Sequence, residues 1–301
     1  MTLLILLALL QNADQRTLKS NLDRKLQSPF LARAAWFTDY DKAREAAAKS
    51  SKPVFAYFTR SDVDAPACTA VEKELWSGEA FLAWAPAVVL YCHVTSRVDG
   101  DRLAALPQDK GSTGLPYVAL LDDEGTLVVR FTGRWELPLL TAAAKKAQAF
   151  VDLKVKAASD PAAKADLALA RLELEEERLT LDDARKRVDG LGELSADQKA
   201  RATGLLADIE AIAIARTVGR DPQTRIDAGR RMAAMKKAGR VPTGDDPSQS
   251  FWVYLMDFAE DAKDAALFAE ALEALKARLA DSPGLKRFVE EQTKRLEGMR
   301  K

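Results

Sequence analysis

The chain has 301 residues, of which 48% are hydrophobic and 30% charged, and its 45 basic side chains are balanced by 45 acidic ones. This composition predicts two folded domains and excludes wholesale disorder and a disulfide-stapled mini-protein. A net charge of zero gives no general attraction for nucleic acid or anionic lipid. One histidine and two cysteines leave little material for a metal centre, so we predict no metal site and no cofactor.

The chain begins with the apolar run Thr2–Leu10, which is too short to span a bilayer, since a span takes about 20 apolar residues. The run is typical of the core of a secretory signal. We therefore predict a signal peptide over residues 1–13 and an exported protein, periplasmic or extracellular, with no stable membrane insertion after its removal. No Lys or Arg precedes the run, which leaves open an N-terminal helix packed on the body of a cytoplasmic protein.

Residues 14–35 have the pattern of one amphipathic helix. Leu18, Leu22 and Leu26 recur at helical spacing, and Ser28-Pro29 interrupts the run. We expect this helix to pack against the domain that follows.

Residues 36–140 alternate between helical and strand patterns, which predicts an α/β sandwich with a central mixed sheet and one antiparallel hairpin. The continuous apolar strands are typical of strands covered on both faces. The expected elements are a helix over Ala43–Lys49 capped by Asp39 or Asp41, a strand over Val54–Phe58, a helix near Cys68–Trp76, a strand over Val88–Val94, a short helix after Asp99-Gly100-Asp101, a strand over Tyr117–Leu121, a turn at 122–125 and a strand over Leu127–Thr132.

Residues 141–301 form a second predicted domain, rich in Ala, Leu, Glu, Lys and Arg with helical periodicity. Its breaks cut the segment from residue 136 into roughly seven helices, whose lengths are those of stacked helical hairpins. We predict a helical-hairpin, tetratricopeptide-like architecture, although no clean repeat of about 34 residues is found. The expected breaks lie at Pro161, Gly190–Gly192, Pro222, Pro242–Pro247 and Pro283, and the clearest expected loop is Gly239–Ser250.

Four short runs between residues 36 and 140 carry a resemblance to the thioredoxin-like family, above all to exported bacterial members with a helical extension. They are Lys52–Thr59, Ala65-Pro66-Ala67-Cys68, Gly114-Leu115-Pro116 and Asp123-Glu124-Gly125. The resemblance implies that the first run is the central strand, the second the Cys-x-x-Cys position at the start of a helix, and the third a cis-proline loop facing that position. The fourth would mark the turn before the last strand.

The chain departs from this family at the nucleophile. The resemblance places Ala65 where the family has the attacking cysteine, and only the second cysteine, Cys68, remains. A methyl group cannot attack a disulfide, so a dithiol reductase or oxidase is not expected. The strand also lacks the buried carboxylate that some thioredoxins have, and Asp62 and Asp64 in the loop would raise the pKa of a nearby thiol.

Other sources of chemistry are weak. Cys92 lies inside a strand and is expected to be a core residue, although a disulfide with Cys68 stays open. His93 points to the opposite face of that strand from Cys92, and a pairing of His93 with Cys68 has no support. The segment Gly111–Gly114 lacks the lysine of a phosphate loop.

The proline loop offers a binding alternative. In the family, the backbone beside this proline pairs with an extended peptide, so the resemblance implies that Leu115 supplies the edge and Pro116 holds its shape, next to Ala65 and Pro66. A purely structural turn is equally open.

Three features of the helical part have a plain and a functional interpretation. A basic stretch could dock an acidic partner but is better explained as a solvated face. The run Phe251–Met256 could form a groove but is better explained as core, and the acidic residues are expected to face water. The basic side chains are Arg225, Arg230, Arg231, Lys236, Lys237 and Arg240, and the acidic ones Glu173, Glu175, Glu176 and Glu177.

The sequence therefore predicts an exported thioredoxin-fold protein that binds a protein or peptide without catalysis, joined to a helical interaction domain. The alternative is enzymatic, with Cys68 as a single thiol in thiol–disulfide exchange and cell redox homeostasis. In a third hypothesis the fold is a scaffold and the helical part carries the function. No nucleic-acid partner is expected, and the oligomeric state stays open.

Overall fold

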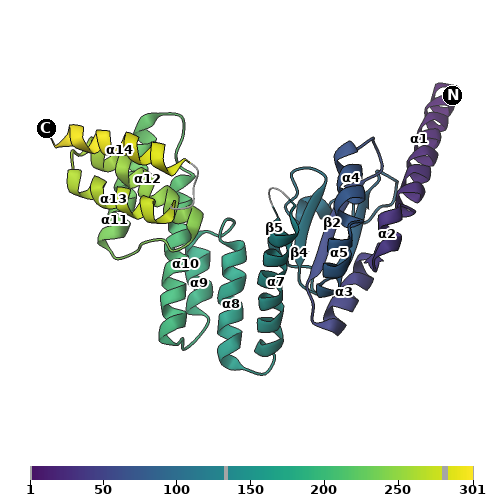
Figure 1. Ribbon diagram of the computed structural model, residues 1–301, viewed down its shortest axis with the longest axis horizontal. Helices are drawn as coiled ribbons and strands as arrows, with labels where there is room; N and C mark the ends of the chain where they lie inside the picture. Colours follow the sequence, from purple (N-terminus) through teal and green to yellow (C-terminus); the bar gives the residue numbers. More distant parts are fainter. Residues whose placement is uncertain (1, 132–134, 280–283, 301) are drawn as a thin grey trace. The chain divides into compact units, whose positions relative to one another are not determined.

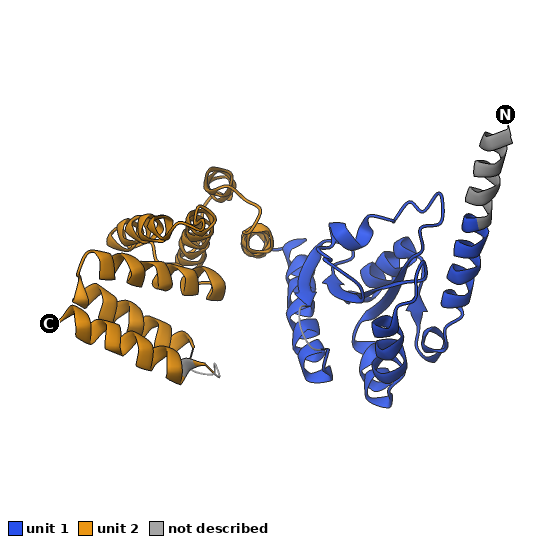
Figure 2. Ribbon diagram, turned by 90° about the horizontal axis from the view of Figure 1, so that it is seen from above, with its two compact units in different colours: residues 1–160 blue, residues 161–301 orange. Residues whose placement is uncertain are grey.

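The structure is a computed structural model that describes residues 2–131, 135–279 and 284–300, with side chains from Asp14 onward except that of Leu285. The described chain is helical over most of its length and holds one β-sheet (Figure 1). It divides into two compact units, Met1–Asp160 and Pro161–Lys301 (Figure 2).

The first unit begins with helix α1 (Thr2–Leu26), which runs through the apolar segment, and helix α2 (Pro29–Arg33). The predicted interruption at Ser28-Pro29 separates the two helices. The Gln15 side chain donates to the carbonyl of Arg97 and accepts from the Asp99 amide, so α1 packs on the body of the unit as expected. No described helix is both long and apolar enough to cross a membrane. The signal peptide stays a prediction.

The sheet is mixed and five-stranded, in the order β1-β3-β2-β4-β5. Strands β1, β2 and β3 are parallel, β4 runs antiparallel to β2, and β4 and β5 form the predicted antiparallel hairpin. The central position of β2 agrees with the resemblance. The strands are β1 (Trp36–Phe37), β2 (Val54–Arg60), β3 (Val89–Thr95), β4 (Tyr117–Leu121) and β5 (Leu127–Phe131).

Helices cover both faces of this sheet, which explains why its strands are apolar without alternation. One face packs on α3 (Tyr40–Ser50), whose first turn is capped by the Asp39 carboxylate, and on α6 (Leu106–Asp109). The other face packs on a helical segment and on aromatic rings, with Trp76 wholly buried against Phe55 and Tyr57. That segment consists of α4 (Pro66–Val71), the π-helical turn η1 (Glu72–Trp76), α5 (Glu79–Trp84) and the 3₁₀ turn η2 (Ala85–Ala87).

Helix α7 (Leu137–Ala157) completes the first unit, so the division lies after Asp160 and not after residue 140 as the sequence analysis predicted. The cause is a set of contacts that tie α7 to the sheet. The Lys154 ammonium lies 3.2 Å from the buried Asp122 carboxylate and 2.6 Å from that of Asp123, both in the turn between β4 and β5. The Ala- and Lys-rich sequence of α7 hides this role, because it resembles the helices that follow.

The described part of the second unit is all helical, and consecutive helices from α11 to α14 pack on one another. Helix lengths range from 9 residues in α9 to 20 in α10, so no constant repeat is established and a tetratricopeptide-like array stays a prediction. The helices are α8 (Pro161–Glu175), α9 (Leu181–Asp189), α10 (Ala196–Ala215), α11 (Pro222–Lys237), α12 (Asp245–Asp261), α13 (Ala265–Arg278) and α14 (Leu285–Met299).

Two expectations about α12 can be checked. Phe251, Leu255 and Met256 are buried in the core of this unit, so the core interpretation of this run is confirmed. The loop predicted over Gly239–Ser250 is shorter, because α12 already begins at Asp245. Pro247 did not exclude this helix start, since proline is tolerated in the first turn. The break predicted at Pro283 lies outside the described residues.

Gly229 allows α11 and α12 to approach closely. A Cβ at this position would overlap the main-chain oxygen of Tyr254 and lie 2.6 Å from the Cβ of Phe258. We expect Gly229→Ala to lower the free energy of unfolding of this unit by about 2 kcal/mol, as overpacking does. Gly298→Ala is the control, because Gly298 has no neighbour within 4 Å and should gain up to about 1 kcal/mol from helix propensity. Urea denaturation followed by circular dichroism measures both, and equal effects of the two variants would contradict the prediction.

Candidate functional site

The motif Ala65-Pro66-Ala67-Cys68 lies where strand β2 passes into helix α4. Ala65 is the residue before the helix, and its side chain makes no capping hydrogen bond. Its carbonyl accepts from the Thr69 amide at 3.1 Å and from the Thr69 hydroxyl at 3.3 Å. The position that the resemblance assigns to the nucleophile therefore presents a methyl group.

Cys68 is a buried thiol with no exposed surface. Burial raises the pKa of this thiol, and the charge of Glu72 acts in the same direction. Hydrogen bonds with the Thr59 hydroxyl and the Arg60 amide, together with the Lys25 charge, lower the pKa but do not outweigh burial. A thiol of this kind is inert, because the thiolate is the nucleophile and needs access to its target.

A buried carboxylate that the sequence pattern does not reveal lies beside this thiol. Glu72 stands one helical turn after Cys68 and is 6% exposed. It accepts hydrogen bonds from the Tyr57 hydroxyl at 2.9 Å and the Thr59 hydroxyl at 2.8 Å, and it forms a 2.6 Å ion pair with Lys25 of α1. The strand itself holds no such carboxylate, as predicted, but helix η1 supplies one. The motif thus lies beside a cluster of polar side chains whose hydrogen bonds and charges are paired with one another. We name it the Glu72 cluster, and it consists of Lys25, Tyr57, Thr59 and Glu72.

Asp62, one of the two loop carboxylates, is held by cations. Asp62 is held by the Arg60 guanidinium through two 2.8 Å hydrogen bonds and by Arg97 at 2.8 Å, and the hydrogen bond from Arg60 lowers the pKa of Asp62. Its charge is compensated by two cations, so it has little effect on Cys68. The raised pKa of Cys68 has a different main cause, which is burial.

Cys92 and His93 lie on opposite faces of β3. Cys92 pairs in register with Tyr57, on the face that carries Trp76, and it is a free buried thiol, as is Cys68. His93 pairs with Phe58 on the other face, and its Nδ1 lies 3.2 Å from the Tyr91 hydroxyl. Burial lowers the pKa of His93. The sheet therefore separates His93 from Cys68, and no thiol–imidazole pair forms.

The proline loop has the form that the resemblance implies, since the peptide bond between Leu115 and Pro116 is cis. Pro116 lines a groove of about 430 Å³ together with four residues of α4 and η1 and one residue after β5, here named the Pro116 groove. The other lining residues are Ala70, Val71, Glu74, Leu75 and Trp135.

The four predicted binding residues do not all meet in this groove. Leu115 is partly buried against the core, and within the described chain its main chain makes no hydrogen bond. Ala65 lines a separate hollow of about 610 Å³ between α1–α2 and the β2–α4 connection, here named the Ala65 hollow. Pro66 lines neither. The sequence of the loop does not predict that α4 lies between the Pro116 groove and the Ala65 hollow.

We expect Cys68 to react with iodoacetamide at least about a hundredfold more slowly than a free thiol, with no acceleration below the ordinary thiol pKa of about 8.5. The physical reason is its burial and raised pKa. Site-resolved mass spectrometry against pH and urea measures the rate, and the thiol introduced by Ala67→Cys, at an exposed position of the same helix, is the control. Fast labelling of the folded protein with an acid-shifted midpoint would contradict it.

In the second unit, the plain interpretation of the basic stretch agrees with its contacts. Arg225, Arg230, Lys236 and Arg240 form ion pairs with Asp257, Asp227, Glu270 and Glu210, respectively. The acidic run is only partly solvated: Glu173 pairs with Arg201 and Glu175 with Arg187.

Glu176 departs from the expectation that this acidic run faces water. It is partly buried and lines a hollow of about 320 Å³. Burial is the main cause that raises its pKa from 4.5 to about 7, and the neighbouring Asp208, Glu173, Glu177 and Asp246 add to it.

This carboxyl gives a pH prediction. The pKa of Glu176 is higher in the folded state than in the unfolded state, so folding takes up a proton at pH values between the two. The contribution of the protonated Glu176 to the free energy of unfolding is therefore full below about pH 4.5 and is lost as the pH rises through about 7. Compared with Glu176→Gln, the free energy of unfolding of the wild type should fall by about 1 kcal/mol between these two pH values. This is less than the whole pKa shift would give, because solvent screens a half-exposed group. Urea denaturation of both proteins across this range checks it, and parallel curves would contradict it.

Comparisons with known proteins add little to this geometry. No model of a known protein family matches the sequence, and no curated protein matches it. A solved structure described as "DsbH Oxidoreductase" is similar with a TM-score of 0.32 and 19% identity, over 36% of this chain and 83% of that chain. A likeness this weak carries no conclusion about the fold or the activity of this chain. Among the described residues, no group of three or more His, Cys, Asp or Glu could hold a metal ion.

Proposed function

We propose that this chain is an exported, non-catalytic protein-binding module with a thioredoxin-like region, joined to a helical interaction domain. One observation carries the non-catalytic part. The position of the nucleophile is the methyl group of Ala65, and the remaining Cys68 is fully buried with a raised pKa. The apolar run Thr2–Leu10 supports export.

The Pro116 groove supports binding. It combines the side chains of Val71, Leu75 and Trp135 with the adjacent main chain of Leu115, which makes no hydrogen bond in the described chain. An extended peptide laid along this edge would gain main-chain hydrogen bonds from Leu115 and apolar contact from the groove. Thiol exchange by Cys68 alone is the less favoured alternative, because a buried thiol cannot reach a client disulfide.

Peptide selection from a displayed random library tests this function. Wild type and Cys68→Ser should select the same peptides with equal affinity. Ala70→Arg, which places a charge in the groove, should weaken them by about tenfold or more, whereas Ala67→Arg, on the same helix but outside the groove, should not. Loss of binding in Cys68→Ser, or disulfide-linked complexes that depend on Cys68, would overturn the proposal in favour of the monothiol alternative.

A further inference from the structure

The Ala65 hollow is a second depression of the first unit, and the Pro116 groove does not account for it. Its volume of about 610 Å³ falls in the range of ligand sites. One wall includes Arg24, Lys25 and Phe30 from α1 and α2, and the other is formed by the β2–α4 connection, α4 and η1. The residues that α1 and α2 contribute all follow the predicted signal peptide.

The lining is mixed, with an apolar part and polar groups around it. Phe30 is 2% exposed and forms part of the inner surface, whereas Val63 is 48% exposed, as are to a similar degree Leu26, Leu139 and Val155 elsewhere in the described chain. The buried hydroxyl of Ser61 has no hydrogen-bond partner among the described residues. An apolar centre with polar groups around it is the anatomy of a protein-binding surface.

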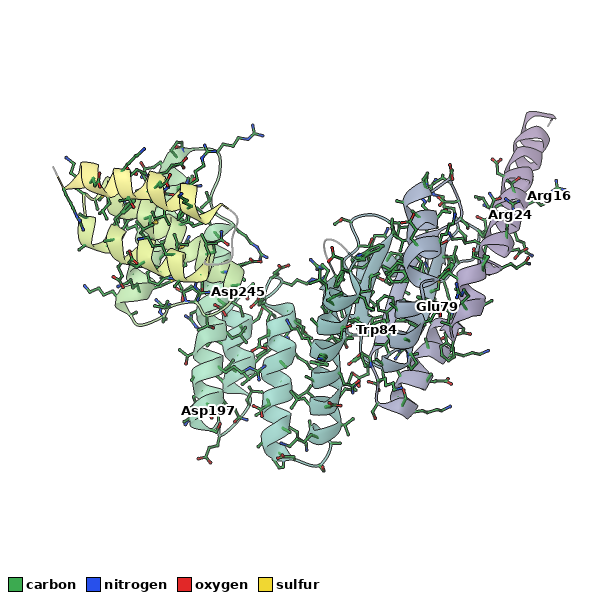
Figure 3. All side chains as sticks on the ribbon, viewed as in Figure 1. Arg16, Arg24, Glu79, Trp84, Asp197 and Asp245 are labelled. Carbon is green, nitrogen blue, oxygen red and sulfur yellow. The ribbon has the colours of Figure 1, made fainter. Side chains whose placement is uncertain are left out.

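The charges of the lining are unequal. Four cations face two carboxylates: Arg24, Lys25, Arg60 and Lys73 against Asp64 and Glu72. The charges of Lys25 and Glu72 cancel each other in their ion pair. Arg60 forms an ion pair with Asp62, which also pairs with Arg97. The remaining cations are Arg24 and Lys73, both exposed and without an ion-pair partner within the described chain, and the only exposed lining carboxylate is Asp64. Arg24 extends from α1 toward solvent in Figure 3.

We propose that the Ala65 hollow binds a short segment of a partner protein in which an acidic side chain adjoins an apolar one. The acidic side chain pairs with Arg24 and Lys73, and the apolar one packs against Val63 and Ala65. This inference rests on the proposed function only in taking the ligand to be part of a protein. It uses residues that the Pro116 groove does not contain, so the two can fail separately.

The first experiment measures the electrostatic potential in the hollow. In the chain with Ala65→Cys and Cys68→Ser, the introduced thiol lines the hollow and cannot form a disulfide with position 68. An anionic methanethiosulfonate, the sulfonatoethyl reagent, should modify it about tenfold faster than the cationic trimethylammonioethyl reagent after correction with a free thiol. Adding Lys73→Glu should abolish the preference, while Lys19→Glu on the exposed side of α1 should leave it unchanged. Equal corrected rates would overturn the proposal.

The second experiment measures binding in the full chain by fluorescence anisotropy. A labelled peptide of alternating Glu and Leu should bind at least about tenfold more tightly than its Gln and Leu counterpart. Arg24→Glu and Lys73→Glu should remove this preference, Asp64→Asn should strengthen binding, and Lys19→Glu and Ala70→Arg should have no effect. Equal affinity for the two peptides would overturn the proposal. Loss of binding in Ala70→Arg would do so as well, because it would place the peptide in the Pro116 groove.

Discussion

Ala65→Cys is expected to turn this chain into a dithiol oxidoreductase. The substituted residue precedes α4, and Cys68 lies in the first turn, three residues later. Residues at this spacing are neighbours on a helix, about 5–6 Å apart, which is within the range that a disulfide bridges. The new thiol is partly exposed in the Ala65 hollow, and its position before a helix lowers its pKa.

Two measurements follow from this substitution. Oxidation should join the new thiol to Cys68, as read by mass spectrometry. The variant should also accelerate insulin reduction by dithiothreitol at least about tenfold over wild type, since a low-pKa exposed thiolate attacks the substrate disulfide and Cys68 releases the mixed disulfide. Electrons pass from dithiothreitol through the pair to insulin.

The matched control is Ala67→Cys, an exposed position next to Cys68 in the same helix. Adjacent helical residues do not face each other, so this variant should gain a reactive thiol but neither the internal disulfide nor the insulin activity. Failure of Ala65→Cys to form the disulfide would mean that the motif is misaligned with the family. A disulfide without insulin activity would contradict the expected redox role of this position.

The sheet was predictable because its strands are recognisable from sequence alone. The apolar runs at Val54–Phe58 and Tyr117–Leu121 are buried on both faces, and the turn at Gly125 joins β4 to β5. Strand β1 was not predictable, because the pairing of Trp36 and Phe37 with β3 is too short to have a period. The end of the first unit was missed for a related reason: Lys154 is one Lys among several in α7, and only the folded turn at Asp122 and Asp123 distinguishes it.

The candidate site was predictable in its positions but not in its environment. Ala65 and Cys68 lie at the start of a helix, and the peptide bond before Pro116 is cis, as the motif order implies. Glu72 could not be found from sequence, because Lys73 and Glu74 beside it make it resemble a solvated residue. Its burial depends on partners 13 and 47 residues away in the chain, and such long-range contacts leave no local pattern. The environment of Asp62 was also not predictable, because its ion pairs with Arg60 and Arg97 leave no pattern in the sequence.

Lys25→Met is expected to destabilise the first unit strongly, because it breaks a largely buried ion pair. Lys25 and Glu72 are 13% and 8% exposed in their side chains and are 2.6 Å apart. Removing the ammonium leaves the Glu72 carboxylate buried with only the hydroxyls of Tyr57 and Thr59 as donors. Breaking a buried pair in this way costs about 3–5 kcal/mol, and we expect about 3 because Lys25 keeps some contact with solvent.

The double variant Lys25→Met/Glu72→Gln separates the lost charge from lost packing. The Gln amide oxygen can still accept from Tyr57 and Thr59 but carries no charge, so the double variant should recover at least half of the loss. Lys19→Met, at an exposed position of the same helix, should change nothing. Urea unfolding followed by tryptophan fluorescence is suited to this test, because Trp36, Trp76, Trp84 and Trp135 all lie in the first unit and only Trp252 in the second. Equal losses in the single and double variants would show that α1 is held by packing alone, whereas recovery would show that the Glu72 cluster is the electrostatic anchor that fixes α1 beside the motif.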